Sequence, residues 1–342
     1  MPTLTVTVLG AGVMGDLGQP RLLVDAGQSP HTYALKPSEA QALEAADLVV
    51  WVGPVLEPFL QRPVGNIAQE SASFRLMRVD GLSVLRTRAG GAWDGHDHGD
   101  GHGEAAHAED AGSEHAPSNH EHESDEHESD EHESDEHESD EHGHDDHGHD
   151  DHAHEAGASG GAIQGIPEIE LDPHVWLDPD NARLLVRAIA VRLAEIDPAN
   201  APAYRANADA MVARIREVES EVADVVGPVA DVPYVVFHDA YQYFERHYGL
   251  NAVGSITLSP DRQPGARRLL EIRDKIAELD ARCVFREPQF APDLVRTVIE
   301  DTTAQVGTLD PLGIAHAAGP DAYPQLLREL GRNLAGCPGG AG

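Results

Sequence analysis

Short apolar runs alternate with segments of helical spacing through much of the chain. Residues 4–10 are rich in β-branched side chains, and residues 48–52, 235–237 and 283–285 are continuously apolar. Both patterns are typical of strands, and the continuous runs indicate buried ones. Each of the last three runs precedes a segment that predicts a helix, and these helices cover residues 57–60, 240–247 and 292–303. The alternation predicts an α/β protein with mostly parallel sheets.

Helical periodicity is strongest near the middle of the chain. Residues 181–193 and 201–226 are expected to be helical, and the second segment repeats apolar side chains every three or four residues. The repeating residues are Met211, Ile215, Val218 and Val222. A helix of this length extends about 40 Å, which is enough to run along or between two lobes. A shorter helix is expected over residues 37–47, with Ser38 as its N-cap.

A glycine-rich motif follows the first expected strand. Gly10-Ala11-Gly12-Val13-Met14-Gly15 has the G-x-G-x-x-G spacing of a dinucleotide-binding turn. That turn must open a helix of several turns, whereas Gly18, Pro20 and the apolar run 22–24 come soon after it. The motif therefore gives little support to nucleotide binding.

Residues 94–161 interrupt the alternation with a low-complexity insertion. Its centre repeats His-Glu-Ser-Asp-Glu, and it contains no apolar residue other than alanine. Such a segment cannot bury enough apolar surface to offset its ordering entropy, so we expect a mobile loop. Its imidazole and carboxylate groups offer many weak ligands for a divalent ion such as zinc, and the alternative is a solvated linker without a metal role. The histidines of the expected low-affinity site are His122, His127, His132, His137, His142, His144, His147, His149, His152 and His154.

The insertion also carries most of the charge. The chain has a formal net charge of -36, and residues 94–155 hold 25 acidic residues, 16 of the 21 histidines and no lysine or arginine. The remaining residues hold 35 acids and 24 bases, which is a net charge of -11. Because such a surface repels nucleic acid and anionic membranes, we expect neither as a partner.

Three histidines outside the insertion stand at the edges of apolar segments. His174 lies in Asp172-Pro173-His174-Val175-Trp176-Leu177, where Asp-Pro breaks stiffen the chain. His31 follows a proline, and His238 ends the apolar run 235–237. A lone histidine in such a position is usually structural. Three of them brought together by folding would form a zinc-type site.

The other two histidines outside the insertion and two tryptophans have simpler interpretations. His247 lies beside Glu245 on a predicted solvated helix face, and His316 lies in an alanine- and glycine-rich loop. We expect neither histidine to bind metal. Trp51 and Trp176 are expected in the core or in a cleft wall.

The features considered so far do not determine the cellular compartment of the protein. The two cysteines, Cys283 and Cys337, would pair in an oxidising compartment, where closing so long a loop stabilises a fold by about 4 kcal/mol, and would be free thiols in a reducing one. The first residues show no basic region followed by an apolar segment and a cleavage site, so no signal peptide is visible. No apolar run reaches the length of a membrane span.

Several motifs together resemble one protein family. They are Gly27-Gln28-Ser29-Pro30-His31, Lys36-Pro37-Ser38-Glu39-Ala40, Ala46-Asp47-Leu48-Val49-Val50-Trp51-Val52-Gly53-Pro54, Asp172-Pro173-His174-Val175-Trp176-Leu177, Val236-Phe237-His238-Asp239-Ala240-Tyr241, Phe285-Arg286-Glu287-Pro288-Gln289-Phe290 and Leu309-Asp310-Pro311-Leu312-Gly313. The family is ZnuA, the zinc-specific substrate-binding protein of bacterial ABC importers. The likeness spans about residues 13–337.

The resemblance implies an architecture. Two (β/α) lobes with mostly parallel sheets would be joined by a long rigid helix, with the metal in the cleft between the lobes. We place the N-terminal lobe, with the insertion, at residues 1–198, the linker helix at residues 199–228 and the C-terminal lobe at residues 229–342.

The resemblance also assigns ligands. His31, His174 and His238 fall on the family's three histidine ligands. Some members have a glutamate just before the first histidine, where this chain has Pro30. The fourth position would then be water or Asp310, which matches the aspartate ligand of related metal-binding proteins.

Further features relate the chain to the family. The insertion matches a variable histidine-rich loop, and Cys283 and Cys337 match a disulfide of some members, which favours a periplasmic location. Family members usually begin with a signal peptide, a strand and a full helix before the segment that matches residues 15–23. We therefore expect a shortened or mis-started N-terminus.

The resulting prediction is a high-affinity zinc-binding protein that delivers Zn2+ to the membrane permease of a bacterial ABC importer. It would act as a monomer in the periplasm without inserting into the membrane, and the insertion would collect or sense zinc. Manganese-binding relatives have a carboxylate in place of His238, so three nitrogen donors favour zinc. The alternative is an envelope zinc buffer or chaperone whose binding resides mainly in the insertion.

A zinc hydrolase is the rival from another class. Three histidines and a water also form a catalytic arrangement, with Glu287 or Asp239 as the base. The chain has no H-E-x-x-H helix, however, and its three histidines lie far apart in the sequence. We therefore expect no enzymatic activity.

Overall fold

The computed structural model describes residues 4–25, 27–66, 73–88, 166–260, 264–316 and 319–337. All of these belong to one unit, which comprises residues 1–96 and 158–342. The insertion, and with it the ten histidines of the expected low-affinity site, lies outside the described residues. The boundaries expected at residues 198 and 228 stay a prediction.

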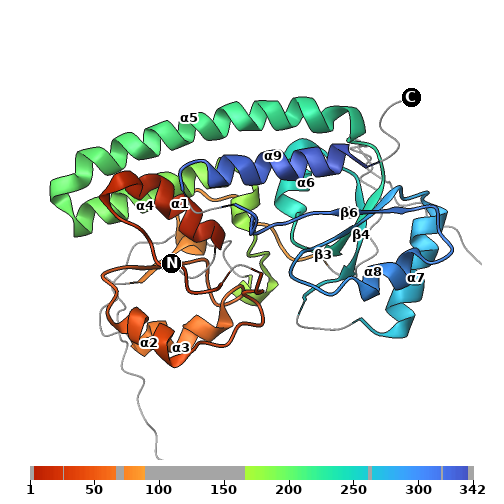
Figure 1. Cartoon of the computed structure of the whole chain (residues 1–342), viewed down its shortest axis with the longest axis horizontal. Helices are drawn as coiled ribbons and strands as arrows, with labels where there is room; N and C mark the ends of the chain where they lie inside the picture. The colour runs from red at the N-terminus through yellow and green to blue at the C-terminus, as the bar shows by residue number, and fades with distance from the viewer. Residues whose placement is uncertain are drawn as a thin grey trace, which may run out of the picture. The chain divides into compact units, whose positions relative to one another are not determined.

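In the described part of the chain, the larger sheet has four parallel strands in the order β4-β3-β5-β6 (Figure 1). The strands are β3 (Tyr234–His238), β4 (Ala252–Thr257), β5 (Cys283–Arg286) and β6 (Gln305–Thr308). The helices between them are α6 (Gln242–Tyr248), α7 (Ala266–Glu278) and α8 (Asp293–Ile299). Every residue of β3 and β4 is buried, as in strands covered on both faces. The two predicted strand-and-helix pairs in this region are confirmed.

A second parallel sheet pairs β1 (Val49–Trp51) with β2 (Ser73–Arg75), and β1 confirms the strand expected over residues 48–52. Helix α2 (Pro37–Glu44) precedes β1, and a 3₁₀ turn (Pro58–Leu60) leads into α3 (Gln61–Asn66) after it.

The N-cap of helix α2 lies two residues before the one that the sequence predicted. Lys36 is the N-cap residue, and the Glu39 carboxylate reaches back to accept its backbone N–H at 2.8 Å. Pro37 takes the first helical position, where its fixed φ fits and no hydrogen-bonding N–H is needed. Ser38 therefore lies inside the first turn, and its prediction as N-cap is wrong.

Three helices lie side by side in Figure 1, with α5 in contact with both of the others. They are α4 (Pro179–Ile196), α5 (Ala201–Val226) and α9 (Ala322–Ala335). Helix α5 has 26 residues and so extends about 39 Å. The buried stripe of α5 contains all four residues whose spacing predicted it. The two helices predicted in this part of the chain are confirmed.

The first described residues form a helix and not the expected strand. Helix α1 (Leu4–Met14) packs against α4, α5 and α9. Local β preference cannot identify a helix that is apolar on all sides, because packing against several neighbours overrides propensity. A Cβ atom on Gly12 would overlap the Met211 side chain of α5. The glycine motif thus follows no strand, and Gly12 permits close helix packing.

A disulfide joins Cys283, at the start of β5, to Cys337, which follows α9. Both residues are buried, and their Cα atoms lie 5.9 Å apart. The predicted pair is confirmed, and it fastens the end of α9 to the larger sheet. No described helix is both long and apolar enough to cross a lipid bilayer.

Candidate metal centre

His174 lies where two distant segments of the chain pair with each other. The Asp172 N–H donates to the Leu85 carbonyl oxygen at 2.9 Å. Pro173 then directs the chain into a 3₁₀ turn (Val175–Leu177), which leads directly into α4. His174 is 4 % exposed. The backbone on both sides of this histidine is therefore held by structure.

The other two histidines come from separate elements. His238 ends β3 at the carboxyl edge of the parallel sheet, where ligand sites of α/β folds are usually found. His31 lies in the loop between α1 and α2, where the Thr32 N–H donates to the Ser29 carbonyl oxygen at 3.3 Å. The fold thus brings together three side chains from distant parts of the sequence.

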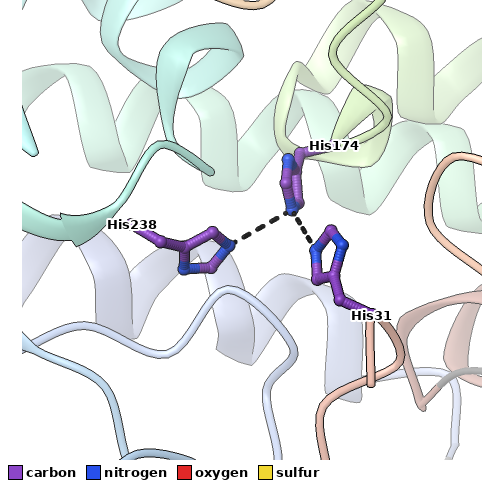
Figure 2. A group of neighbouring side chains, drawn as sticks. All are labelled: His31, His174 and His238. Atoms are coloured by element: carbon purple, nitrogen blue, oxygen red, sulfur yellow. Dashed lines mark hydrogen bonds between the residues drawn. The ribbon is translucent and has the colours of Figure 1, made fainter. Parts of the chain in front are cut away.

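Figure 2 shows the three imidazole rings facing a common point. The Nε2 atom of His174 lies 3.4 Å from Nε2 of His31 and 3.4 Å from Nε2 of His238. One ligand atom of each ring lies within 4.8 Å of the others. Two nitrogens bound at about 2.05 Å to one tetrahedral zinc ion are separated by roughly 3.3 Å. The observed spacing therefore fits a common zinc ion.

Carboxylates hold the outer nitrogen of two of the rings. His174 Nδ1 is 2.7 Å from Asp172 Oδ1, and His238 Nδ1 is 2.5 Å from Glu287 Oε1. In the neutral ring Nδ1 donates to the carboxylate, and Nε2 then presents a lone pair to the centre. Lone pairs that face each other repel unless a cation or proton lies between them. Carboxylate–histidine pairs of this kind are typical of metal sites.

Burial lowers the pKa of both rings, but their neighbours act on the two rings in different ways. Burial and the neighbouring His238 lower the pKa of His174 well below its ordinary value, so this ring is neutral. Burial also lowers the pKa of His238, but the charge and hydrogen bond of Glu287 outweigh burial and raise that pKa overall. Burial raises the pKa of Asp172 to about 7, against the hydrogen bond from the His174 backbone. Of the two buried rings, His238 is the one that holds a proton more readily.

A cavity of about 10 Å³ lies beside the three histidines and has room for roughly one water molecule or ion. Gln289 lines this cavity, and its Oε1 atom is buried without a hydrogen-bond partner. Asp310 does not belong to the group of mutually close ligand atoms. Its oxygens accept the N–H groups of Leu312 at 3.0 Å and Ile314 at 2.6 Å. The role of Asp310 as fourth ligand stays a prediction.

The two tryptophans are buried, as expected. Trp51 is 5 % and Trp176 1 % exposed. The Trp176 ring stands edge-on to the His174 ring with centroids 5.3 Å apart, so it packs against one of the three histidines.

The helix face around His247 is not solvated, so that prediction is wrong. The His247 ring is 2.9 Å from Glu219 of α5 and 3.3 Å from Asp178 at the start of α4, and Glu245 is 2 % exposed. Asp178, Asp180 and His247 form a second group of close donor atoms.

An arginine already supplies the positive charge in that second group. Arg183 pairs with both Asp180 and Glu219.

His316 lies 2.8 Å from Glu329 and outside both groups of close donor atoms.

Sequence reasoning missed the side chains that orient the histidines. Glu287 was considered only as a catalytic base, yet it accepts from His238. Asp172 also accepts the His174 backbone N–H at 3.0 Å, and this Asx-type bond was a local signal for its role. Arg88 gave no local signal, because its partner Asp239 is 151 residues away in the sequence.

The chain is similar to known proteins along most of its length. The family model of ZnuA, zinc-uptake complex component A, periplasmic, matches residues 5–337. The high-affinity zinc uptake system protein ZnuA of Brucella abortus (strain 2308) is 42 % identical over 327 residues, which cover 96 % of this chain and 87 % of that protein.

Solved structures support the predicted fold. A crystal structure of ZnuA has a TM-score of 0.67 at 20 % identity, covering 99 % of this chain and 97 % of that one. The periplasmic zinc binding protein TroA of Treponema pallidum has a TM-score of 0.69 at 15 % identity, covering 98 % and 96 %. The α/β fold with a long helix is thereby confirmed.

Proposed function

We propose, from the premise that this chain belongs to the ZnuA family of periplasmic zinc-uptake components, that it captures Zn2+ and delivers it to a membrane permease. The ligands in this proposal are His31, His174 and His238. The observation that carries it is the convergence of three Nε2 atoms, with His174 3.4 Å from each of the other two. Nitrogen donors at this spacing suit a tetrahedral zinc ion.

The donor set also supports a preference for zinc over manganese. Imidazole suits borderline ions such as zinc, whereas carboxylate and water suit manganese. Asp172 and Glu287 are bonded to the outer nitrogens of His174 and His238 and thus act through the rings. They increase the basicity of the ring nitrogens without adding oxygen donors.

Water is the fourth ligand in this proposal. The carboxylate of Asp310 already accepts two backbone N–H groups. Gln289 offers a buried Oε1 atom without a partner at the edge of the small cavity. A zinc-bound water there would donate a hydrogen bond to Gln289.

The partner in this proposal is the permease of an ABC importer, and the place is the periplasm, as the family description supports. The protein would act as a monomer, with the insertion collecting zinc at low affinity. Catalysis has little support, because Glu287 accepts from His238 and Asp239 pairs with Arg88. Both candidate bases are therefore already engaged.

Zinc calorimetry on the full chain with a competing chelator tests the proposal. We expect one tight site in the wild-type protein that manganese does not displace. His174→Ala should remove this site, and His247→Ala, outside the centre, should retain it. Tight binding in His174→Ala would contradict the proposal.

A variant without residues 94–155 separates the centre from the insertion. We expect it to keep the tight site and to lose only weak binding. If the tight site disappeared with the insertion, the buffer or chaperone function would be favoured.

A further inference from the structure

Arg88 carries the positive charge next to the metal centre. Its side chain is 15 % exposed. Its Nε atom lies 3.0 Å and 3.1 Å from the two carboxylate oxygens of Asp239, and its Nη2 atom also donates to Asp239. The same Nη2 atom is 2.8 Å from Glu245 of α6. One guanidinium group thus holds two buried carboxylates.

Asp239 lies at the edge of the metal centre without belonging to its ligand group. It directly follows His238 in the chain. Asp239 and Arg88 line an open cavity of about 540 Å³ that also reaches His31 and His174. The negative charge of Asp239 favours protonation of His174 and His238, as expected of a carboxylate close to both rings. Asp239 shares this open cavity with His31 and His174, whereas Asp172 and Glu287 are bonded to the outer ring nitrogens, so Asp239 is a candidate for an additional oxygen donor.

We propose that Arg88 determines the metal selectivity of the three-histidine site by occupying both carboxylate oxygens of Asp239, so that the protein itself offers the ion nitrogen donors alone. This inference rests on the proposed function. Oxygen donors favour harder ions such as manganese, whereas imidazole favours zinc. Without Arg88, Asp239 would be a buried carboxylate that lacks this counter-ion, and a divalent cation in the centre would attract it.

The geometry of the pair explains why an arginine is needed. A guanidinium group is planar, permanently charged and able to engage both oxygens of one carboxylate. A lysine at this position would supply the charge from one point and leave one oxygen of Asp239 more accessible. The selectivity effect should therefore depend on guanidinium shape as well as on charge.

A purely structural ion pair would behave differently. Arg88 follows Thr87, whose N–H donates to the Glu170 carbonyl oxygen at 2.8 Å, so the arginine also links two chain segments to β3 and α6. Loss of such a link would lower stability and affinity for all metals together. A change in the ratio of zinc to manganese affinity is predicted only if Arg88 keeps the Asp239 oxygens away from the ion.

The test compares zinc and manganese affinities of the full chain, measured by competition, in Arg88→Met and in Arg86→Met. Arg86 is the matched control, because its side chain is 61 % exposed and lies 3.9 Å from Glu170. We expect the preference for zinc over manganese to fall roughly tenfold or more in Arg88→Met, the usual size of effects from residues behind metal ligands. The preference should stay unchanged in Arg86→Met.

Two further variants make the outcome decisive. Arg88→Met with Asp239→Asn should restore the preference, because the freed carboxylate is gone. Arg88→Lys keeps the positive charge and serves as the second variant in case Arg88→Met does not fold. It should lose part of the preference for zinc over manganese. An unchanged preference in the folded Arg88 variants, or no restoration by Asp239→Asn, would overturn the inference. Absence of tight zinc binding in the wild-type protein would instead overturn the proposed function.

Discussion

At the scale of single residues, buried acids shape the metal centre as much as its histidines do. Asp172 and Glu287 orient two rings, and Arg88 holds Asp239 and Glu245. Burial raises the pKa of Asp172 and of Glu245 to about 7, against the opposing charge of Arg88. Arg88 pairs with two of these four buried carboxylates, and the other two are bonded to histidine rings. A divalent cation in the centre would offset part of their negative charge.

Glu57 is a buried acid outside the metal centre, and its titration should be visible in stability. Its residue is 0 % exposed, and its Oε2 atom accepts the N–H groups of Val52 at 2.7 Å and Gly53 at 3.1 Å. Burial raises its pKa from an ordinary 4.5 to about 8, although both hydrogen bonds oppose the rise. A pKa that is higher in the folded state gives stability that is full below the ordinary value and is lost as the pH rises through about 8.

We therefore expect Glu57→Gln to match the wild-type free energy of unfolding at about pH 4, below the ordinary pKa, and to exceed it at about pH 9. Glutamine can still accept both backbone N–H groups but never ionises. Urea unfolding of metal-free protein at the two pH values measures the difference. Glu44→Gln, an exposed position in α2, controls for loss of a surface charge. A difference that is the same at both pH values would contradict the assignment.

At the scale of elements, the sequence predicted a helix or strand correctly where the pattern of its apolar residues matches their burial in the fold. The stripe of Met211, Ile215 and Val218 predicted α5, and the continuous apolar run at β3 predicted a buried parallel strand. Helix α1 could not be predicted, because its sequence favours a strand and only its packing against three other helices favours a helix. Local propensity does not contain that information.

The candidate site likewise has residues that the sequence identified and residues that it could not identify. His31, His174 and His238 were identifiable from their local settings together with the resemblance to one family. The bond from His238 to Glu287 spans 49 residues and that from Arg88 to Asp239 spans 151, so neither leaves a local pattern. Partners that meet only through tertiary structure could not be predicted from spacing.

Strand β6 illustrates a tertiary constraint that opposes local preference. Gly307 pairs with Phe285 on β5, and a Cβ atom on Gly307 would overlap the ring of this 1 % exposed residue. Valine is a better strand former than glycine. We nevertheless expect Gly307→Val to lower the free energy of unfolding by about 1–3 kcal/mol, as overpacking does.

The matched control for this strand is Val306→Thr, at a position that is 44 % exposed. It should change the free energy of unfolding by less than about 0.5 kcal/mol. Chemical denaturation of both variants measures the contrast. A Gly307→Val protein as stable as the wild type would show that Phe285 can move aside.

At the scale of the whole described unit, the metal centre connects segments that the chain keeps apart. His31 follows α1, His174 precedes α4 and His238 ends β3. Unfolding separates these segments and destroys the convergence of their nitrogens. Binding of an ion to all three therefore adds to the stability of the folded state, since the unfolded chain lacks the site.

Zinc should accordingly raise the midpoint of thermal unfolding. The gain in the free energy of unfolding should be about 4 kcal/mol when free zinc is a thousandfold above the dissociation constant. The gain should shrink as the pH falls from about 7.5 to about 5.5, because zinc must displace protons from its histidines. Burial lowers the pKa of His174, so at this ring protons compete little with zinc. Glu287 raises the pKa of His238 against burial, so at that ring protons compete more strongly. Calorimetric scans of wild type and His238→Ala, each with and without zinc, measure the gain at each pH. His238→Ala should lose it throughout this range, and an equal gain in that variant would place the stabilising zinc outside the three-histidine centre.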